Sequence, residues 1–339
     1  MESGSLAPRA ANPAGSSLRG GSRLPDRVLR WGLFTLAALV LVLLAYFFAR
    51  LYTESRPVLR KEGFFDFVFA NNWTVAKGMY GAGALLVGTL ITAAIALVIG
   101  VPVAIAVAIY VNEFCPQRAR YPLTVLVELL AAVPSVVYGL WGVFVLIPRL
   151  KPAEQWFSDT FSFLPFVGGT VAGPNYFIGG LILAIMILPI VSAIAREVVA
   201  TVPNELKEAA LALGATRWEM IRLAVLPYSR SGIAGGAMLG LGRAIGETIA
   251  VTLVIGNSPE IGKTIFSQGY TLAAVIANEF GEAAADPVHR AALIAAGLVL
   301  FLLTLIINAV ARTYVTRAER NLRAAGPVAD AATAPAGAA

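Results

Sequence analysis

The chain has very little cysteine, histidine or charge. Among its 339 residues there is one cysteine (Cys115) and one histidine (His289), and only 14% are Asp, Glu, Lys or Arg. A single cysteine excludes an internal disulfide framework, and one cysteine with one histidine excludes a Cys/His metal cluster. A soluble domain carries about 25% charged residues. With 58% hydrophobic residues, the composition is instead typical of a protein that crosses a membrane several times.

Catalytic signatures are also missing. The sequence has no Gly-x-x-x-x-Gly-Lys-Ser/Thr phosphate loop, so we expect this chain not to hydrolyse ATP. Its apolar segments contain no serine–histidine or paired-aspartate arrangement, which argues against an intramembrane enzyme. We therefore expect a chain that is not an enzyme and binds no cofactor or metal. The pI near 9.6 is explained by loop charges that set membrane topology, not by a nucleic-acid partner.

Long apolar runs dominate what is present. A membrane-spanning helix needs about 20 mostly apolar residues. Six segments qualify, at 31–48, 78–112, 121–148, 176–195, 231–255 and 291–311. They predict an all-α polytopic membrane protein with six transmembrane helices. A cleaved signal peptide is the alternative for residues 1–50, but the uncharged run is longer than such a peptide needs, so we favour a retained first helix.

The other residues set the domain limits. We predict a disordered cytoplasmic tail at 1–28, the first transmembrane helix and an outer loop at 29–78, and the transport core at 79–313. A cytoplasmic C-terminal tail follows at 314–339, disordered from about 321 because it is rich in Ala, Pro and Gly. An even number of spans puts both termini on one side. That side holds the larger share of the 26 Lys and Arg residues, so both termini are expected in the cytoplasm.

The cytoplasmic loop 201–227 predicts two short helices. Pro203 suits the start of the first helix, and Gly214 suits a left-handed stop at its end. Thr216 and Glu219 have the spacing of a capping box that opens the second helix. Pro227 marks the point at which that helix gives way to the next span. The loop is thus a helix-turn-helix that either docks another protein or packs on its own bundle.

The same loop resembles the EAA loop of ABC importer permeases, which reads Glu-Ala-Ala, three residues, Gly, nine residues, Ile, one residue, Leu-Pro. The matching positions are Glu208, Ala209, Ala210, Gly214, Leu226 and Pro227, while Ala224 stands where the pattern prefers Ile. The resemblance implies a coupling helix that sits in a groove of a separate cytoplasmic ATPase, with Glu208, Ala209, Ala210 and Gly214 at the contact. It also implies the type I ABC importer permease fold.

Arg243 and Glu247 form a charged pair near the middle of the apolar segment 231–255. Each ion at a bilayer centre costs about 2.5–3.5 kcal/mol on insertion scales, so such residues mark a substrate pathway or a buried bridge between helices. Arginine presents a planar donor fork that suits phosphate oxygens. Glutamate can accept a hydrogen bond from a protonated phosphate hydroxyl, which sulfate lacks, and can hold the arginine when the site is empty.

Three further stretches resemble the PstC-type permeases of the phosphate-specific (Pst) transporter. They are Val133-Pro-Ser-Val-Val-Tyr-Gly-Leu-Trp-Gly142, Gly242-Arg-Ala-Ile-Gly-Glu-Thr-Ile-Ala250 and Ala274-Val-Ile-Ala-Asn-Glu-Phe-Gly-Glu282. The resemblance covers about residues 30–320. In that family the positions that match Arg243 and Glu247 are implicated in phosphate passage.

These resemblances imply a permease subunit of an ATP-driven importer of inorganic phosphate in a bacterial cytoplasmic membrane. Its partners would be a homologous permease subunit, two ATPase subunits, which use the ATP, and an extracytoplasmic phosphate-binding protein. Two alternatives stay open. One is an importer of another oxyanion, sulfate or molybdate. The other is a secondary anion transporter or channel that needs no ATPase.

Overall fold

The computed structural model describes residues 24–324 and divides the chain into two compact units, 1–50 and 51–339. Helix α1 (Leu24–Glu62) supplies the described part of the first unit, where its apolar side chains are exposed. Because α1 begins at Leu24, residues 24–28 are helical, although the sequence predicted them in the disordered tail. The rest of that tail lies outside the described residues.

The described part of the second unit is helical, with two isolated β-bridges and no strand. After α1 its elements are α2 (Phe64–Phe69), η1 (Val75–Lys77), α3 (Gly83–Ile109), η2 (Tyr110–Phe114), α4 (Gln117–Ala132), α5 (Ser135–Trp141), η3 (Gly142–Leu146), α6 (Ile147–Thr160), α7 (Tyr176–Ala200), α8 (Asn204–Ala212), α9 (Arg217–Met220), η4 (Ile221–Val225), α10 (Leu226–Gly246), α11 (Ile249–Val254), α12 (Leu272–Glu279), η5 (Glu282–Ala285) and α13 (Pro287–Ala324). The elements η2, η3 and η4 are π-helical, and η1 and η5 are 3₁₀ turns. Helix α13 continues to Ala324, past the predicted start of tail disorder at about 321, and the remaining tail is outside the described residues.

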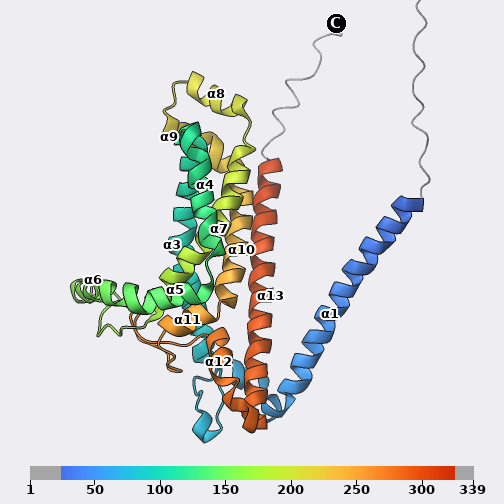
Figure 1. Cartoon of the computed structure of the whole chain (residues 1–339), viewed down its shortest axis with the longest axis vertical. Helices are drawn as coiled ribbons and strands as arrows, with labels where there is room; N and C mark the ends of the chain where they lie inside the picture. Colours follow the sequence, from blue (N-terminus) through green and yellow to red (C-terminus); the bar gives the residue numbers. More distant parts are fainter. Residues whose placement is uncertain (1–23, 325–339) are drawn as a thin grey trace, which may run out of the picture. The chain divides into compact units, whose positions relative to one another are not determined.

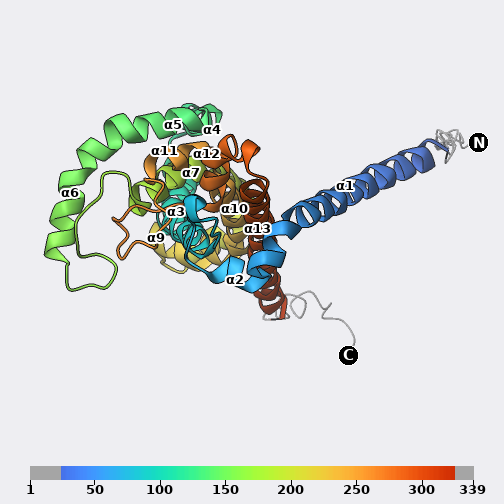
Figure 2. The ribbon, with the colours of Figure 1, turned by 90° about the horizontal axis from the view of Figure 1, so that it is seen from below.

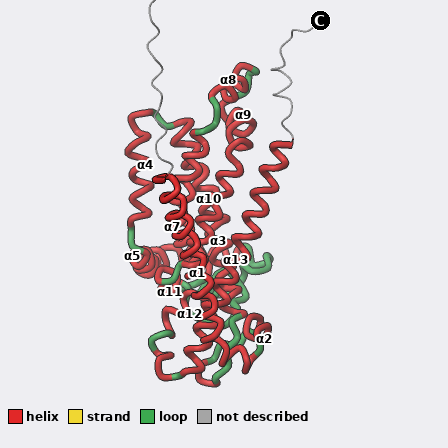
Figure 3. Tube along the Cα trace, turned by 90° about the vertical axis from the view of Figure 1, so that its right-hand side faces the viewer, coloured by secondary structure: helices red, strands yellow, loops and turns green. Residues whose placement is uncertain are grey.

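The core of this unit is a bundle in which α7 packs along both α3 and α10 (Figures 1 and 3). Glycine allows the close approach at each contact. A Cβ on Gly180 of α7 would lie 2.5 Å from the Ile95 side chain of α3, and one on Gly240 of α10 would lie 2.7 Å from Val191 of α7. Small residues at such contacts are typical of helices packed in a membrane, where backbones must come close to gain dispersion energy.

Five of the described helical segments are long and apolar enough to cross a membrane. They are Arg27–Glu62, Gly83–Phe114, Ser135–Thr160, Tyr176–Ala200 and Pro287–Arg317. Four of them overlap the predicted first, second, fourth and sixth spans. The polytopic all-α prediction is confirmed, whereas the count of six is not, because two predicted spans are interrupted.

The predicted span 121–148 is broken at Val133–Pro134. Helix α4 ends at Ala132, Val133 has extended backbone (φ −68°, ψ 126°), and α5 starts at Ser135. A residue before proline avoids the helical region, and proline itself has no N–H to continue the ladder. Figures 1 and 2 show α5 and α6 running across the direction of α4 instead of continuing it.

The predicted span 231–255 is broken as well. Helix α10 ends at Gly246, Glu247 is extended (φ −71°, ψ 130°), and α11 starts at Ile249. The prediction of one continuous helix here was wrong, because it read hydropathy alone and hydropathy does not register a local change of backbone.

The two ends of the bundle differ. Helix α8 and the C-terminal end of α13 lie at one end, and α2 and α12 lie at the other (Figures 1 and 3). At the α12 end, Glu279 Oε2 accepts a hydrogen bond from Trp73 Nε1 at 3.0 Å and lies 2.9 Å from His289 Nε2. His289 is buried and stacks on Tyr80 with a ring-centroid distance of 5.8 Å. This polar cluster ties α12 and α13 to the segment before α3.

Candidate functional site

Arg243 and Glu247 flank the interruption of the α10–α11 segment. Arg243 is in the last turn of α10, and Glu247 is the residue at which that helix ends. Arg243 Nη2 lies 3.8 Å from Glu247 Oε2. The arginine side chain is 44% exposed and the glutamate side chain 9% exposed. The pair is therefore formed across a helix end, with the cation open and the carboxylate covered.

The local backbone favours both charges. The C-terminal end of a helix carries partial negative charge, which stabilises a cation such as Arg243 in the last turn of α10. Glu247 Oε1 accepts a hydrogen bond of 3.5 Å from the backbone N–H of Ala250 in α11. The Arg243–Glu247 distance is longer than a hydrogen bond. Within the described residues the guanidinium makes no hydrogen bond, so its donors remain available to an anion.

The α4–α5 break lies beside the same arginine. A cavity of about 100 Å³ lies between the two interrupted helices and α7. Its lining is apolar except for Arg243 and Tyr138. The lining residues are Leu130, Ala131, Val133, Tyr138, Met186, Ile190 and Arg243. Tyr138 donates a 2.7 Å hydrogen bond to the Leu130 carbonyl, one of the α4 carbonyls that the break frees.

Close packing holds the two breaks together. A Cβ on Gly139 of α5 would lie 2.6 Å from Leu253 and 3.1 Å from the Ala250 Cα, both in α11. Glycine at position 139 thus allows α5 to contact α11 directly. Discontinuous helices of this kind surround the substrate sites of many transporters, because irregular backbone at membrane depth needs protein or a cavity around it. The arrangement can hold an anion against one exposed guanidinium.

The loop 201–227 folds as the sequence predicts. Helix α8 follows Pro203, and Gly214 has φ +85°. The Gly214 N–H donates to the Leu211 carbonyl at 3.0 Å, and the Ala215 N–H donates to the Ala210 carbonyl at 3.2 Å. These two bonds form a Schellman motif, which satisfies carbonyls at the end of α8 and requires a left-handed residue at position 214. A Cβ on Gly214 would meet nothing within 4 Å, so backbone conformation alone explains the glycine.

The predicted capping box opens α9. The Thr216 Oγ1 accepts from the Glu219 N–H at 3.3 Å, and Glu219 Oε2 accepts from the Thr216 N–H at 2.7 Å. Hydrogen bonds from the Thr216 backbone and hydroxyl lower the pKa of the Glu219 carboxyl below its ordinary value. Pro227 occupies the first turn of α10, as expected for a residue without an N–H.

The predicted coupling residues divide between two faces. Glu208, Ala209 and Gly214 are exposed, whereas Ala210 is half-buried and packs against the apolar cluster around Met220. The exposed surface of the loop also carries large apolar side chains, with Leu213 90% and Trp218 61% exposed. The helix-turn-helix thus packs on its own bundle through one face and leaves an apolar face open.

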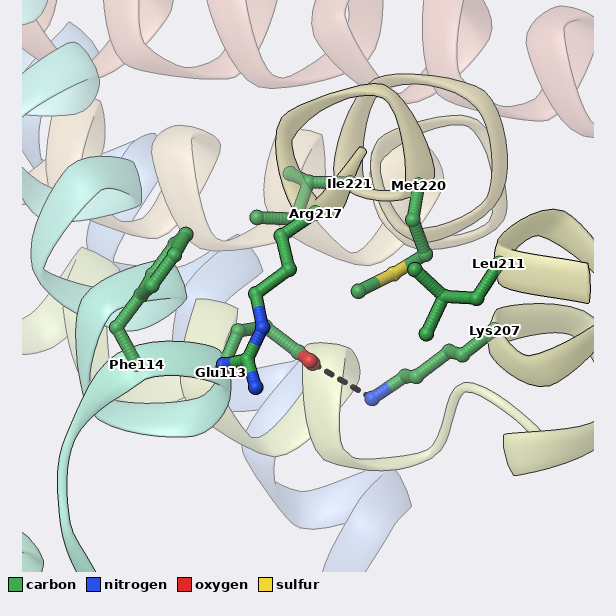
Figure 4. A pocket seen from close by; sticks show the side chains of 7 residues that line it. All are labelled: Glu113, Phe114, Lys207, Leu211, Arg217, Met220 and Ile221. Carbon is green, nitrogen blue, oxygen red and sulfur yellow. Dashed lines mark hydrogen bonds and ion pairs between the residues drawn. The ribbon is translucent and has the colours of Figure 1, made fainter. Parts of the chain in front are cut away.

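Two ion pairs at the α8 end of the bundle were not predicted from the sequence. Lys207 Nζ lies 2.6 Å from Glu113 Oε1, and Arg196 Nη2 lies 2.9 Å from Glu128 Oε1. Figure 4 shows Lys207 and Glu113 pointing toward one another across a pocket. The pairs join residues far apart in the sequence, so no local spacing reveals them.

The structure does not bring the Arg243–Glu247 pair close to the predicted coupling loop. Arg243 lies in the last turn of α10, and Pro227, which closes the coupling motif, lies in the first. Helical rise separates them by roughly 24 Å. Any link between the sites must therefore pass through helices.

Comparison with known proteins gives the family. Residues 100–320 match the model of the binding-protein-dependent transport system inner membrane component family. The "Phosphate transport system permease protein PstC" of Mesorhizobium japonicum is 46% identical over 84% of this chain and 88% of its own length. The protein with the same description from Xylella fastidiosa strain 9a5c is 39% identical over 94% of this chain and 99% of its own.

A solved structure supports the fold. The crystal structure of a bacterial ABC transporter involved in the import of the acidic polysaccharide alginate has a chain that matches with a TM-score of 0.52 and 20% identity, over 87% of this chain and 99% of that one. It supports the ABC importer permease fold and nothing about the cargo. From the family model and the PstC relatives, the chain belongs to the binding-protein-dependent transport system inner membrane components and, among them, to the PstC-type permeases.

Proposed function

We propose that this chain is the transmembrane permease subunit of an ATP-driven importer of inorganic phosphate in a bacterial cytoplasmic membrane. The observation that carries the proposal is the extended similarity to PstC proteins, 46% identity over 84% of the chain in one case. The open guanidinium of Arg243 at two facing helix breaks is chemically consistent with an anionic cargo.

Arg243 and Glu247 are proposed as the substrate pathway. Phosphate carries between one and two negative charges at neutral pH, and an arginine fork can donate two parallel hydrogen bonds to its oxygens. Glu247 lies close enough to attract the arginine between transport events and to accept a bond from a protonated phosphate hydroxyl. The pair either contacts the anion directly or gates its passage by exchange of partners.

Glu208, Ala209, Ala210 and Gly214 are proposed as the contact with the ATPase. The exposed small residues allow a partner surface to approach closely. The neighbouring apolar side chains provide surface that can be buried in the contact. The full assembly would hold a homologous permease subunit, two ATPase subunits that use ATP, and an extracytoplasmic phosphate-binding protein. The α8 end of the bundle and the C-terminal end of α13 would then face the cytoplasm, together with the N-terminus.

The domain limits are proposed on the same grounds. Residues 79–313 form the permease core and 201–227 its coupling loop, with α1 as an additional span before the core. The chain would bind no cofactor of its own.

Competition for uptake tests the cargo. Uptake of labelled phosphate by cells that depend on this chain should be inhibited by unlabelled phosphate and unaffected by equal sulfate or molybdate. Inhibition by sulfate or molybdate, with little by phosphate, would favour the importer of another oxyanion. A secondary anion transporter would continue uptake when the ATPase partner is deleted, whereas the proposed importer stops.

A further inference from the structure

Lys207 faces the transmembrane bundle, unlike the other charged residues of α8. Glu205 and Glu208 are exposed, but the Lys207 side chain is only 18% exposed. Its Nζ lies 2.6 Å from Oε1 of Glu113, whose side chain is 10% exposed. A charge-assisted hydrogen bond of this length is among the stronger polar contacts in proteins, and water screens a covered pair less than a surface pair.

Glu113 lies in η2, a π-helical segment that is bound to two further helices. Asn112 Nδ2 donates to the Arg196 carbonyl of α7 at 2.8 Å. From the first turn of α4, Arg120 Nε donates to the Val111 carbonyl at 2.9 Å, and the Arg120 guanidinium also contacts the Asn112 carbonyl. Segments of π-helix frequently occur at functional sites. Through η2, Lys207 is therefore connected to both α7 and α4.

A second set of contacts joins α7 to α4. Arg196 Nη1 donates to Thr124 Oγ1 at 2.6 Å, and its Nη2 bonds Glu128 Oε1 at 2.9 Å. Helix α4 then runs without interruption to Ala132, and Leu130 and Ala131 near its end line the cavity that Arg243 also lines. The polar contacts thus lead from α8 to a continuous helix, α4, whose far end borders the proposed pathway.

Apolar packing attaches α8 mainly to other elements than η2. Helix α8 packs chiefly on α9 and η4. On the η2 side, a pocket of about 230 Å³ separates it from the bundle, and the lysine and glutamate span that space (Figure 4). The pocket is lined by Glu113, Phe114, Lys207, Leu211, Arg217, Met220 and Ile221.

We propose that the Lys207–Glu113 ion pair is a positioning contact that transmits movement of α8 to α4 and α7, and so couples ATP hydrolysis to opening of the pathway. The inference rests on the proposed function, because it assigns a role within the same importer. Neither residue is among those that line the cavity beside Arg243. A lost pair should therefore uncouple transport from hydrolysis, whereas lost docking would abolish assembly.

The test is the number of phosphate ions transported per ATP hydrolysed by the complete importer in proteoliposomes. Lys207→Glu and Glu113→Lys each place like charges together, so transport per ATP should fall at least fivefold while the ATPase still copurifies. The double variant K207E/E113K restores an opposite pair and should recover the wild-type ratio within twofold. Lys207→Arg keeps the charge and should behave as wild type.

Lys61→Glu is the matched control, because it reverses the charge of an exposed lysine paired with Glu62 at 3.3 Å outside α8. Surface pairs contribute little, so the number of phosphate ions transported per ATP should not change in this variant.

An unchanged ratio in both single variants would overturn the inference, and so would a double variant that stays uncoupled. If the single variants fail to assemble, the double variant decides: recovery of assembly and coupling supports the pair, and failure of either refutes it. A wild-type complex that moves no phosphate would instead contradict the proposed function.

Discussion

Arg243 Nη2, in the last turn of α10, lies 3.8 Å from Oε2 of Glu247, the residue at which α10 ends. A helix interior would hold such a pair on one continuous surface. Here the extended backbone at Glu247 turns the carboxylate back toward α11, where the Ala250 N–H binds it, and leaves the guanidinium facing a cavity. The two charges therefore occupy different environments, with the guanidinium exposed and the carboxylate covered.

Removal of either charge should stop transport. Arg243→Ala removes the only charged group among the described residues that line the cavity, and Glu247→Ala leaves the arginine without this counter-ion. We expect phosphate uptake to fall more than tenfold in each variant, with normal membrane levels and ATPase association. Arg312→Ala removes an exposed arginine from α13 and serves as the control. Normal uptake in both site variants would refute the pathway assignment.

Charge reversal at Glu208 should weaken docking. Glu208 is exposed on α8, so Glu208→Lys does not disturb the packing of the bundle but changes the surface offered to the ATPase. We expect the yield of ATPase that copurifies with the chain to fall at least fivefold. Glu260→Lys makes the same change at an exposed site outside α8 and should leave the yield unchanged. If both variants copurify equally, Glu208 does not contribute to the contact.

Alanine at position 214 should loosen the coupling loop. Gly214 has φ +85°, and a residue with a Cβ in the left-handed region costs about 1–2 kcal/mol. Amide hydrogen exchange at the C-terminal end of α8 should therefore be roughly tenfold faster in Gly214→Ala. Gly235→Ala is the control, because Gly235 is helical and its Cβ would meet nothing within 4 Å. Helix propensity predicts no loss there. Equal exchange in wild type and Gly214→Ala would argue against the Schellman cap.

The sequence predicted the parts of this protein that depend on local patterns. The cap at Gly214, the capping box of Thr216 and Glu219, and the overlap of four spans with helices all follow from residue spacing and hydropathy. The break at Glu247 was not predicted, because the prediction read hydropathy, which does not register a local change of backbone; beyond the break, α11 packs against α5.

The missed contacts share one property. Lys207 and Glu113 are 94 positions apart, and Arg196 and Glu128 are 68 apart. Only the packing of α4, α7, α8 and η2 brings them together. The same applies to His289, whose burial against Tyr80 and Glu279 follows from the docking of α13 on the segment before α3.

The Glu279 cluster should stabilise the α12 end of the bundle. Glu279→Ala leaves Trp73 Nε1 without its acceptor and removes the carboxylate that lies beside His289 Nε2. A buried donor without a partner costs about 1–3 kcal/mol. Thermal unfolding of the purified complex should occur at a lower temperature. Glu282→Ala removes an exposed carboxylate from the following turn and should have little effect. Equal unfolding temperatures for the two variants would show that the cluster does not stabilise the fold.

The central claim is that phosphate crosses the membrane through this chain. Uptake of labelled phosphate at low external concentration, in cells with and without the chain, tests it most directly. We predict that deletion abolishes ATP-dependent uptake, that wild type restores it, and that Arg243→Ala expressed at the same level does not. Uptake that is unchanged by deletion, or fully restored by the Arg243→Ala variant, would contradict the account.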